Sequence, residues 1–325
     1  MAAAQCGAPP RTAAQRIKTA AAPSLPLPAT TCCGRLPRMF QNDLLRGQVV
    51  LITGGGTGLG RAMALRCAEL GAGVAICGRR GGVVEATAEE IRAATGGEVL
   101  AGPCDVRRFE EVEAWVASAV ARFGKVTALV NNAAGNFLAQ TETLSPNAFR
   151  TVVDIVLAGS FHATLAAGRQ MIQQGEGGTV LSIVTTYAWM GSAYVVPSAC
   201  AKAGVLALTR SLAVEWGSHR IRCNAIAPGP IPTEGAFSRL MPPGLMEQSL
   251  RKVPLGRVGE QRELADLAAY LLAPGSAYIN GEVVTIDGGE WLNGGEFNHL
   301  TQIPREQLAA GFAALRGRPE KKADG

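Results

Sequence analysis

The sequence is poor in the residues that build metal centres and disulfide frameworks. It holds eight cysteines without paired spacing, no C-x-x-C motif and only three histidines among 325 residues. This cysteine usage is typical of a reducing compartment and predicts no metal site. The sequence also lacks a run of about 18 apolar residues, so we expect no transmembrane helix.

Acidic residues are absent from residues 1–42, which are rich in Ala and Pro and carry five basic side chains: Arg11, Arg16, Lys18, Arg35 and Arg38. The rest of the chain has 26 acidic side chains and the same number of basic ones. Because this larger part is balanced, the overall charge of +5 does not indicate a nucleic-acid-binding surface.

Three interpretations of residues 1–42 stay open. The segment is a transit peptide, a disordered extension, or an artefact of an upstream start, since Met39 lies just before the first expected structure. Arg outnumbers Lys by 25 to 6 across the chain, which suggests a GC-rich genome. We therefore favour a bacterial cytoplasm over a mitochondrion, which the transit-peptide interpretation would imply.

Short apolar runs alternate with helix-period segments from Gln48 onwards. Seven such runs predict buried strands within residues 48–54, 73–78, 98–106, 126–135, 177–185, 221–231 and 281–289. Repeated strand–helix units require a parallel sheet covered on both faces. We therefore predict an α/β fold: one Rossmann-type, doubly wound domain over residues 43–300, with a seven-stranded parallel sheet. Residues 301–325 read as a C-terminal helix and charged tail.

A glycine-rich turn follows the first predicted strand. Gly54, Gly58 and Gly60 are spaced as G-x-x-x-G-x-G and precede a helix. Glycine lets the backbone approach a pyrophosphate, and a helix N-terminus offers free N–H groups to it. The whole loop, including Gly56, Thr57 and Leu59, is therefore predicted to bind a dinucleotide.

The end of the second strand carries Arg79 and Arg80 where an NAD site would place an acidic residue. A guanidinium suits a dianionic 2′-phosphate in charge and geometry, so we infer NADPH. Asp105 ends the third strand. It is expected either at the adenine edge of the cofactor or as a helix N-cap, and the sequence does not separate these readings.

Several blocks resemble the short-chain dehydrogenase/reductase superfamily: the glycine loop, "NNAAG" at 131–135 and "PGPI" at 228–231. The resemblance covers essentially all of 45–290. Its usual members use Asn, Ser, Tyr and Lys together. Position by position, only Lys202 is kept, while Val156, Thr185 and Ser198 replace the Asn, Ser and Tyr.

One group within that superfamily, the mitochondrial-type 2,4-dienoyl-CoA reductases, has this pattern. The similarity extends through "NNAAGNF" (131–137), "LSPNAF" (144–149), "DIVLAGSF" (154–161) and "GGEFN" (294–298). The resemblance implies NADPH-dependent reduction of 2,4-dienoyl-CoA to 3-enoyl-CoA in fatty-acid beta-oxidation, by a homotetramer. It assigns the substrate chemistry to Tyr187 and Asn136, with Lys202 on the nicotinamide ribose, and cofactor contacts to Pro228, Gly229, Pro230 and Ile231.

The residue types suit this chemistry. A dienoyl thioester that accepts hydride at its far alkene carbon collects charge on its thioester oxygen, which a phenol and an amide can hold. Tyr187 can also protonate the α-carbon. Ser198 lies one helical turn from Lys202 and is expected to orient the site. Tyr187 could instead be a packing aromatic, Asn136 a turn residue, and Tyr194 is a rival phenol.

Acyl-CoA recognition is expected from a few further residues. The resemblance implies substrate contacts for Arg107, Phe137, Ser145 and Arg239, although Ser145 also suits a helix N-cap. The segment 233–250 resembles a mobile lid over an acyl chain. Two other functions remain as alternatives: an ordinary carbonyl or 3-ketoacyl reductase, and a non-catalytic NADP(H)-binding protein.

Overall fold

The computed structural model describes residues 40–233, 244 and 246–317. The extension predicted over 1–42 therefore lies almost entirely outside the described residues, and its three interpretations stay open. The boundary predicted at residue 300 stays a prediction.

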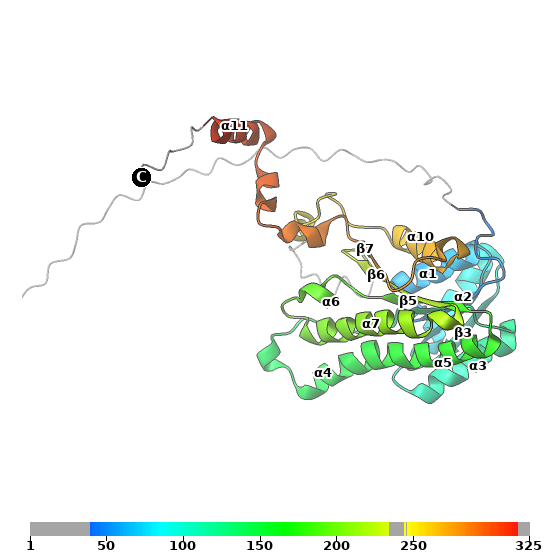
Figure 1. Ribbon diagram of the computed structural model, residues 1–325. Coiled ribbons are helices and arrows are strands. Elements are labelled where there is room, and N and C mark those ends of the chain that lie inside the picture. Colours follow the sequence, from blue (N-terminus) through cyan, green and yellow to red (C-terminus); the bar gives the residue numbers. More distant parts are fainter. Residues whose placement is uncertain (1–39, 234–243, 245, 318–325) are drawn as a thin grey trace, which may run out of the picture. The chain divides into compact units, whose positions relative to one another are not determined.

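All seven strands predicted from the sequence form a single parallel sheet (Figure 1). They are β1 (Val49–Thr53), β2 (Gly73–Gly78), β3 (Val99–Pro103), β4 (Ala128–Asn131), β5 (Gly178–Ile183), β6 (Ile221–Pro228) and β7 (Val283–Ile286), in the order β3-β2-β1-β4-β5-β6-β7. The predicted fold is confirmed. The order reverses between β1 and β4, and the crevice at the carboxyl ends of such strands is where this fold binds ligands.

Helices cover both faces of the sheet (Figure 1). One core cluster joins the sheet to α1 (Gly58–Glu69), α2 (Gly81–Thr95) and α10 (Gln261–Leu272). A second joins the opposite face to α3 (Phe109–Phe123), α5 (Gly159–Gln174) and the end of α7 (Val196–Glu215). Because strand side chains alternate, Val50 and Ile52 enter the first cluster while Val49 and Leu51 enter the second.

The helical run after Ser145 is continuous but changes its winding. It comprises α4 (Pro146–Val153), a π-helical turn η2 (Asp154–Ala158) and α5. Ser145 is the N-cap, as predicted, because its Oγ accepts from the Ala148 N–H at 3.1 Å. By length and composition alone, Pro146–Gln174 could cross a membrane. However, half of its most apolar 18-residue stretch is buried in the domain. Packing against the sheet accounts for this apolar surface.

Short elements complete the described chain. They are η1 (Thr141–Thr143), α6 (Tyr187–Met190), η3 (Gly217–His219), α9 (Met246–Leu250), η4 (Pro274–Ser276), η5 (Glu290–Gly294), η6 (Asn298–Gln302) and α11 (Arg305–Arg316). The one-turn helix α6 was not predicted. It begins shortly after β5, which ends at Ile183, and places Tyr187 at its first position.

A buried ion pair ties α1 to α10. The Arg66 Nε donates to Asp266 Oδ1 at 2.5 Å, and both side chains are close to nine-tenths buried. Glu69 and Arg262 extend the pair into a network at its edge. Since α1 begins at the glycine loop, this network also fixes the helix whose N-terminus faces the crevice.

Candidate active site

The glycine loop after β1 is shaped so that its backbone is open to a ligand. Gly54 has φ +65° and Gly58 has φ +55°, a region that favours glycine. A Cβ on Gly60 would overlap the Gly54 carbonyl oxygen and come within 2.5 Å of the Asn132 amide nitrogen. The loop therefore requires glycine for its own close packing. It leaves the N-terminus of α1 in the crevice, which fits a pyrophosphate.

Asn132 braces this loop from the end of β4. Its Nδ2 donates to the carbonyl oxygens of Thr53 and Gly54, at 3.0 and 3.1 Å. Its own N–H and that of Ala133 donate to Thr53 Oγ1, both at 3.0 Å. In the sequence, Asn132 stands only as part of the motif "NNAAG", with no role predicted for it. Its position directly after a buried strand was the signal that could have shown its role.

The end of β2 presents two exposed arginines, Arg79 and Arg80, and neither forms an ion pair within the described part of the chain. Both guanidinium groups are therefore free to meet an anion. Asp105 lies after the neighbouring strand β3, close enough that the Arg79 charge helps to lower the pKa of its carboxyl. These residues lie where the adenosine half of a dinucleotide is expected.

Asp105 is not a helix N-cap, because α3 begins at Phe109 with Arg108 as its cap. Its carboxylate instead accepts from the Arg107 backbone N–H at 3.1 Å and from the Arg107 guanidinium at 2.5 to 3.0 Å. The hydrogen bonds from the Arg107 guanidinium lower the pKa of the Asp105 carboxyl. Partial burial raises it, but this effect is smaller. The Arg107 guanidinium is therefore already paired with the Asp105 carboxylate. To contact coenzyme A as predicted, it would have to bind the carboxylate and the coenzyme at the same time.

Lys202 is buried on α7, with 7% of its surface exposed. Its Nζ donates to the carbonyl oxygen of Ile183, the last residue of β5, and to no other group in the described residues. Burial lowers its pKa from 10.5 to about 8. The Lys202 ammonium has three N–H donors but only one acceptor among the described residues. Its other donors can therefore bind hydroxyl groups of a ligand, such as those of a nicotinamide ribose.

Tyr187 and Asn136, predicted to handle the substrate, and Ser198, predicted to orient the site, lie in one hydrogen-bonded group. The Asn136 Nδ2 donates to the Tyr187 hydroxyl at 3.3 Å, and that hydroxyl lies 3.0 Å from Ser198 Oγ. The Asn136 Oδ1 accepts from the Phe137 N–H at 2.9 Å, which fixes the direction of the amide. Either hydroxyl of the Tyr187–Ser198 pair can be the donor, and Ser198 is 2% exposed. The arrangement brings two neutral donors to one point.

The rival phenol lies elsewhere. Tyr194 is 58% exposed, and its hydroxyl makes no hydrogen bond with any described residue. Its backbone has φ +65°, and its carbonyl oxygen accepts from the Ala139 N–H at 3.0 Å. Tyr194 therefore holds the segment after Asn136 through its backbone, whereas Tyr187 presents its hydroxyl to the amide.

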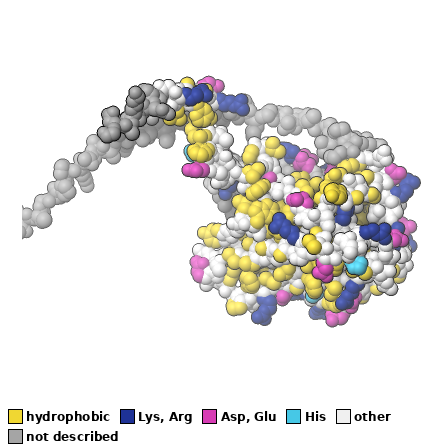
Figure 2. Space-filling model, viewed as in Figure 1, with side chains coloured by type: hydrophobic (Ala, Val, Ile, Leu, Met, Phe, Trp, Pro, Cys, Tyr) yellow, Lys and Arg dark blue, Asp and Glu magenta, His cyan; other side chains and the backbone are white. Residues whose placement is uncertain are grey.

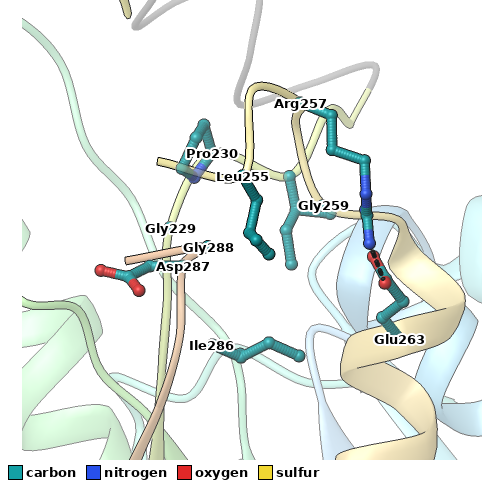
Figure 3. A pocket seen from close by; sticks show the side chains of 10 residues that line it. Gly229, Pro230, Leu255, Arg257, Gly259, Glu263, Ile286, Asp287 and Gly288 are labelled. Atoms are coloured by element: carbon teal, nitrogen blue, oxygen red, sulfur yellow. Dashed lines mark hydrogen bonds and ion pairs between the residues drawn. The ribbon is translucent and has the colours of Figure 1, made fainter. Parts of the chain in front are cut away.

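The loop after β6 packs tightly against the end of β7. A Cβ on Gly229 would lie 2.6 Å from the Asp287 Cβ, so only glycine fits there. A small cavity of about 80 Å³ lies behind this loop, with Pro230, Leu255 and Ile286 in its wall (Figure 3). It is too small for a nucleotide, since ligand pockets usually reach about 300 Å³ or more. The Asp287 carboxylate points away from the Arg257–Glu263 ion pair across the cavity (Figure 3).

The predicted substrate residues are only partly described. Phe137 is half-buried against the cluster of α4, η2 and α7. Ser145 is exposed and already caps α4. Arg239 and residues 234–243 and 245 of the predicted lid lie outside the described residues. Arg251, just after the predicted lid segment, pairs with Glu247 at 2.8 Å on the surface. Among the described residues, no three His, Cys, Asp or Glu side chains gather as metal ligands.

A family model described as enoyl-(acyl carrier protein) reductase matches residues 54–290, from the glycine loop to the turn just after β7. The chain belongs to the short-chain dehydrogenase/reductase family. It is therefore an oxidoreductase of a family that uses a nicotinamide cofactor.

Relatives in several organisms agree with this assignment. A Bacillus subtilis protein named probable 2,4-dienoyl-CoA reductase [(2E)-enoyl-CoA-producing] is 48% identical, over 76% of this chain and 97% of its own length. An Arabidopsis thaliana protein named peroxisomal 2,4-dienoyl-CoA reductase [(3E)-enoyl-CoA-producing] is 40% identical, over 83% and 92%. A 3-ketoacyl-(acyl-carrier-protein) reductase from Brucella melitensis, solved with NADH, has a TM-score of 0.71 at 30% identity, over 76% and 99%.

As a short-chain dehydrogenase/reductase, this chain departs from its family's usual site in a defined way. Ser198 occupies the usual tyrosine position, yet it contacts the hydroxyl of a tyrosine supplied from α6. Val156 replaces the usual asparagine and is completely buried. A phenol and an amide, those of Tyr187 on α6 and of Asn136, lie instead beyond the carboxyl ends of β5 and β4.

Proposed function

We propose that this chain reduces 2,4-dienoyl-CoA thioesters to 3-enoyl-CoA thioesters with NADPH, a step in the beta-oxidation of unsaturated fatty acids. The observation that carries the proposal is the Asn136–Tyr187–Ser198 group. It presents a neutral amide and a neutral phenol together, which suits an oxygen that gains charge during reaction. The names of the Bacillus and Arabidopsis relatives support the same substrate class.

The residues act as follows in this proposal. NADPH would supply a hydride to the far alkene carbon of the diene. Asn136 Nδ2 and the Tyr187 hydroxyl then turn from each other to the thioester oxygen and stabilise the charge that collects there. Tyr187 delivers its proton to the α-carbon, which leaves the remaining double bond at the 3-position. Ser198 holds the phenol in place and can take part in replacing its proton.

Lys202 and the arginines define the cofactor in the proposal. Lys202 binds the nicotinamide ribose through its unused donors and keeps a positive charge near the reacting groups. Arg79 and Arg80 bind the 2′-phosphate, which distinguishes NADPH from NADH. Their exposure and lack of described ion-pair partners support this assignment.

An ordinary carbonyl reductase is disfavoured by the same geometry. Ser198 cannot replace the phenol that such an enzyme needs at that position, since an aliphatic hydroxyl is a much weaker acid. The retained Lys202 and the converging donors also disfavour a non-catalytic protein, in which nothing would keep these groups together.

A spectrophotometric assay tests the proposal. Purified protein is mixed with NADPH and a panel of 2,4-dienoyl-CoA thioesters, and loss of NADPH absorbance is followed together with loss of diene conjugation. Both signals should fall in equal molar amounts. Chromatography of the product then separates 3-enoyl-CoA from the 2-enoyl-CoA named for the Bacillus relative. Reduction of ketones without reduction of any dienoyl-CoA would contradict the proposal, and so would tight NADPH binding without turnover.

Assembly and location are further parts of the proposal. We propose a homotetramer, for which the exposed Phe149 and Phe161 on α4 and α5 offer apolar contact surface. Sedimentation analysis measures this directly. A bacterial cytoplasm remains the favoured location, and a mitochondrion the alternative. The named relatives include a bacterial protein and a peroxisomal one, so localisation of the full-length protein with and without residues 1–39 is the relevant test.

A further inference from the structure

Tyr194 has a backbone conformation that is unusual for its residue type. Its φ is +65°, and among the described residues only one other non-glycine residue, Arg220 at +59°, has a positive φ. This left-handed region is disfavoured for residues with a Cβ, and such strain persists only where the surrounding structure holds it. The Tyr194 side chain is 58% exposed, and exposed hydrophobic side chains occur at many places on the domain surface (Figure 2), so its exposure alone indicates no role. The contacts of its backbone explain the conformation better.

The Tyr194 backbone forms a hydrogen bond that joins two segments far apart in the sequence. Its carbonyl oxygen accepts from the Ala139 N–H at 3.0 Å. Tyr194 directly precedes Val195, the N-cap of α7, and the first turn of this helix carries Ser198. Because the φ of Tyr194 sets the direction of the chain arriving from α6 relative to this carbonyl, a change to negative φ would not keep both α6 and the bond to Ala139 in place.

Ala139 is one of two backbone anchors around Asn136. On the other side, the Ala133 N–H donates to a threonine hydroxyl at the end of β1, at 3.0 Å. Residues 134–138 between the anchors belong to no helix or strand, and their backbone forms no hydrogen bond with another described backbone group. Asn136 is the middle residue of this stretch. The position of its amide therefore depends on both anchors, one of which is the Tyr194 carbonyl oxygen.

The same two segments also meet at the proposed reacting groups. The Asn136 amide reaches the Tyr187 hydroxyl at 3.3 Å, and this hydroxyl lies 3.0 Å from Ser198 Oγ. The contact at 3.3 Å is longer than most N–H···O hydrogen bonds, so by itself it holds the amide weakly. The shorter backbone bond between Ala139 and Tyr194 joins these segments as well and adds the missing restraint.

We propose that Tyr194 is a positioning residue that acts through its backbone: its left-handed conformation directs its carbonyl oxygen to Ala139 and so keeps the Asn136 amide within reach of the Tyr187 hydroxyl. The inference rests on the proposed function. The exposed side chain takes no part in this role, so the requirement at position 194 is tolerance of a positive φ. Asn and Gly tolerate a positive φ most readily, and β-branched residues tolerate it least.

Substitutions that differ in this tolerance test the role in the full-length protein. Tyr194→Val should lower kcat with 2,4-hexadienoyl-CoA by about 10- to 100-fold, because a misplacement of about 1 Å at a reacting group can cost that much. Tyr194→Asn and Tyr194→Gly should keep kcat within about twofold of wild type, although both remove the ring. The KM for NADPH should stay within about twofold in all these variants, since the contacts of Ala133 and Lys202 are kept.

Arg220→Val is the matched control for a general effect of backbone strain. It places the same β-branched residue at the other positive φ, just before the amino end of β6 and away from the carboxyl ends where the site lies. It should lower the thermal midpoint of unfolding without lowering kcat of the folded protein. Full kcat in Tyr194→Val would overturn the inference. So would a loss in Tyr194→Asn and Tyr194→Gly as large as that in Tyr194→Val, because the side chain would then matter.

Hydrogen–deuterium exchange keeps this inference distinct from the proposed function. Exchange in a peptide containing Ala139 should be faster in Tyr194→Val than in wild type and unchanged in Tyr194→Asn, whether or not the protein reduces a dienoyl-CoA. Equal exchange in these proteins would overturn the positioning role even if a dienoyl-CoA is reduced. Faster exchange in Tyr194→Val, in a wild-type background that reduces no dienoyl-CoA, would support the backbone restraint and contradict the proposed function.

Discussion

Replacing Tyr187 with phenylalanine is the most direct test of the active-site chemistry. The substitution keeps the ring and removes only the hydroxyl, which lies 3.3 Å from Asn136 Nδ2 and 3.0 Å from Ser198 Oγ. Ser198 is almost fully buried, so it loses its phenol partner without gaining water. The fold should persist, because no core cluster includes the hydroxyl.

The expected loss follows from the two roles assigned to the hydroxyl. Loss of one donor to a developing oxyanion costs about 10²- to 10³-fold in kcat. Loss of a proton donor costs about 10²- to 10⁴-fold. Since one group fills both roles, these factors do not simply multiply. We expect kcat with 2,4-hexadienoyl-CoA to fall at least about 10²-fold, equivalent to about 3 kcal/mol of transition-state stabilisation.

The assay follows NADPH absorbance at saturating cofactor, and NADPH binding is measured separately by fluorescence. NADPH affinity should stay unchanged, because Lys202 and the glycine loop make no contact with the hydroxyl. Tyr194→Phe is the matched control, since that hydroxyl has no hydrogen-bond partner among described residues. Activity above about a tenth of wild type in Tyr187→Phe would refute the reasoning. An equal loss in Tyr194→Phe would show that the wrong phenol had been assigned.

Three further variants test the cofactor site and the fold. Arg79→Ala should raise the KM for NADPH about 10- to 100-fold, the worth of charge-assisted hydrogen bonds, and leave that for NADH unchanged; equal effects on both cofactors would contradict the 2′-phosphate role. Burial lowers the pKa of Lys202 from 10.5 to about 8. Between pH 8 and pH 10.5, the unfolded state therefore binds more protons at this group than the folded state does. The free energy of unfolding should therefore gain about 3 kcal/mol from this group as pH rises from 8 to 10.5, and urea titrations of Lys202→Met should lack that gain. Asp266→Ala removes the Arg66 partner at 2.5 Å and leaves Glu69 as its remaining carboxylate, so it should lower the free energy of unfolding by about 1.5 to 3 kcal/mol. A loss below about 0.5 kcal/mol would show that Glu69 and water replace the Asp266 carboxylate.

Much of the fold could be predicted because its signals are local. The seven apolar runs coincide with the seven strands, since a strand buried on both faces needs continuous apolar residues. Ser145 caps α4 as expected, because an N-cap depends only on the next turn. The one-turn helix α6 was missed since four residues carry no periodic pattern.

The candidate site could be listed from the sequence but not assembled from it. The motif residues indicated a nicotinamide cofactor and a displaced acid. The resemblance already favoured Tyr187 over Tyr194, and the structure adds what surrounds each: one hydroxyl meets Asn136 and Ser198, while the other residue is exposed. Asp105 likewise suited a helix cap until the structure showed α3 beginning at Phe109.

Sequence alone determined the alternation of strands and helices, the glycine loop and the absence of a tyrosine at position 198, because these depend on neighbours along the chain. Tertiary structure decided which distant loops meet. Asn136 and Tyr187, 51 positions apart, converge because the carboxyl ends of parallel β4 and β5 lie side by side. Trp189 meets Trp291 because Asp287 fixes the segment after β7. Periodicity records only which face a residue buries, whereas contacts between loops depend on the order of strands in the sheet.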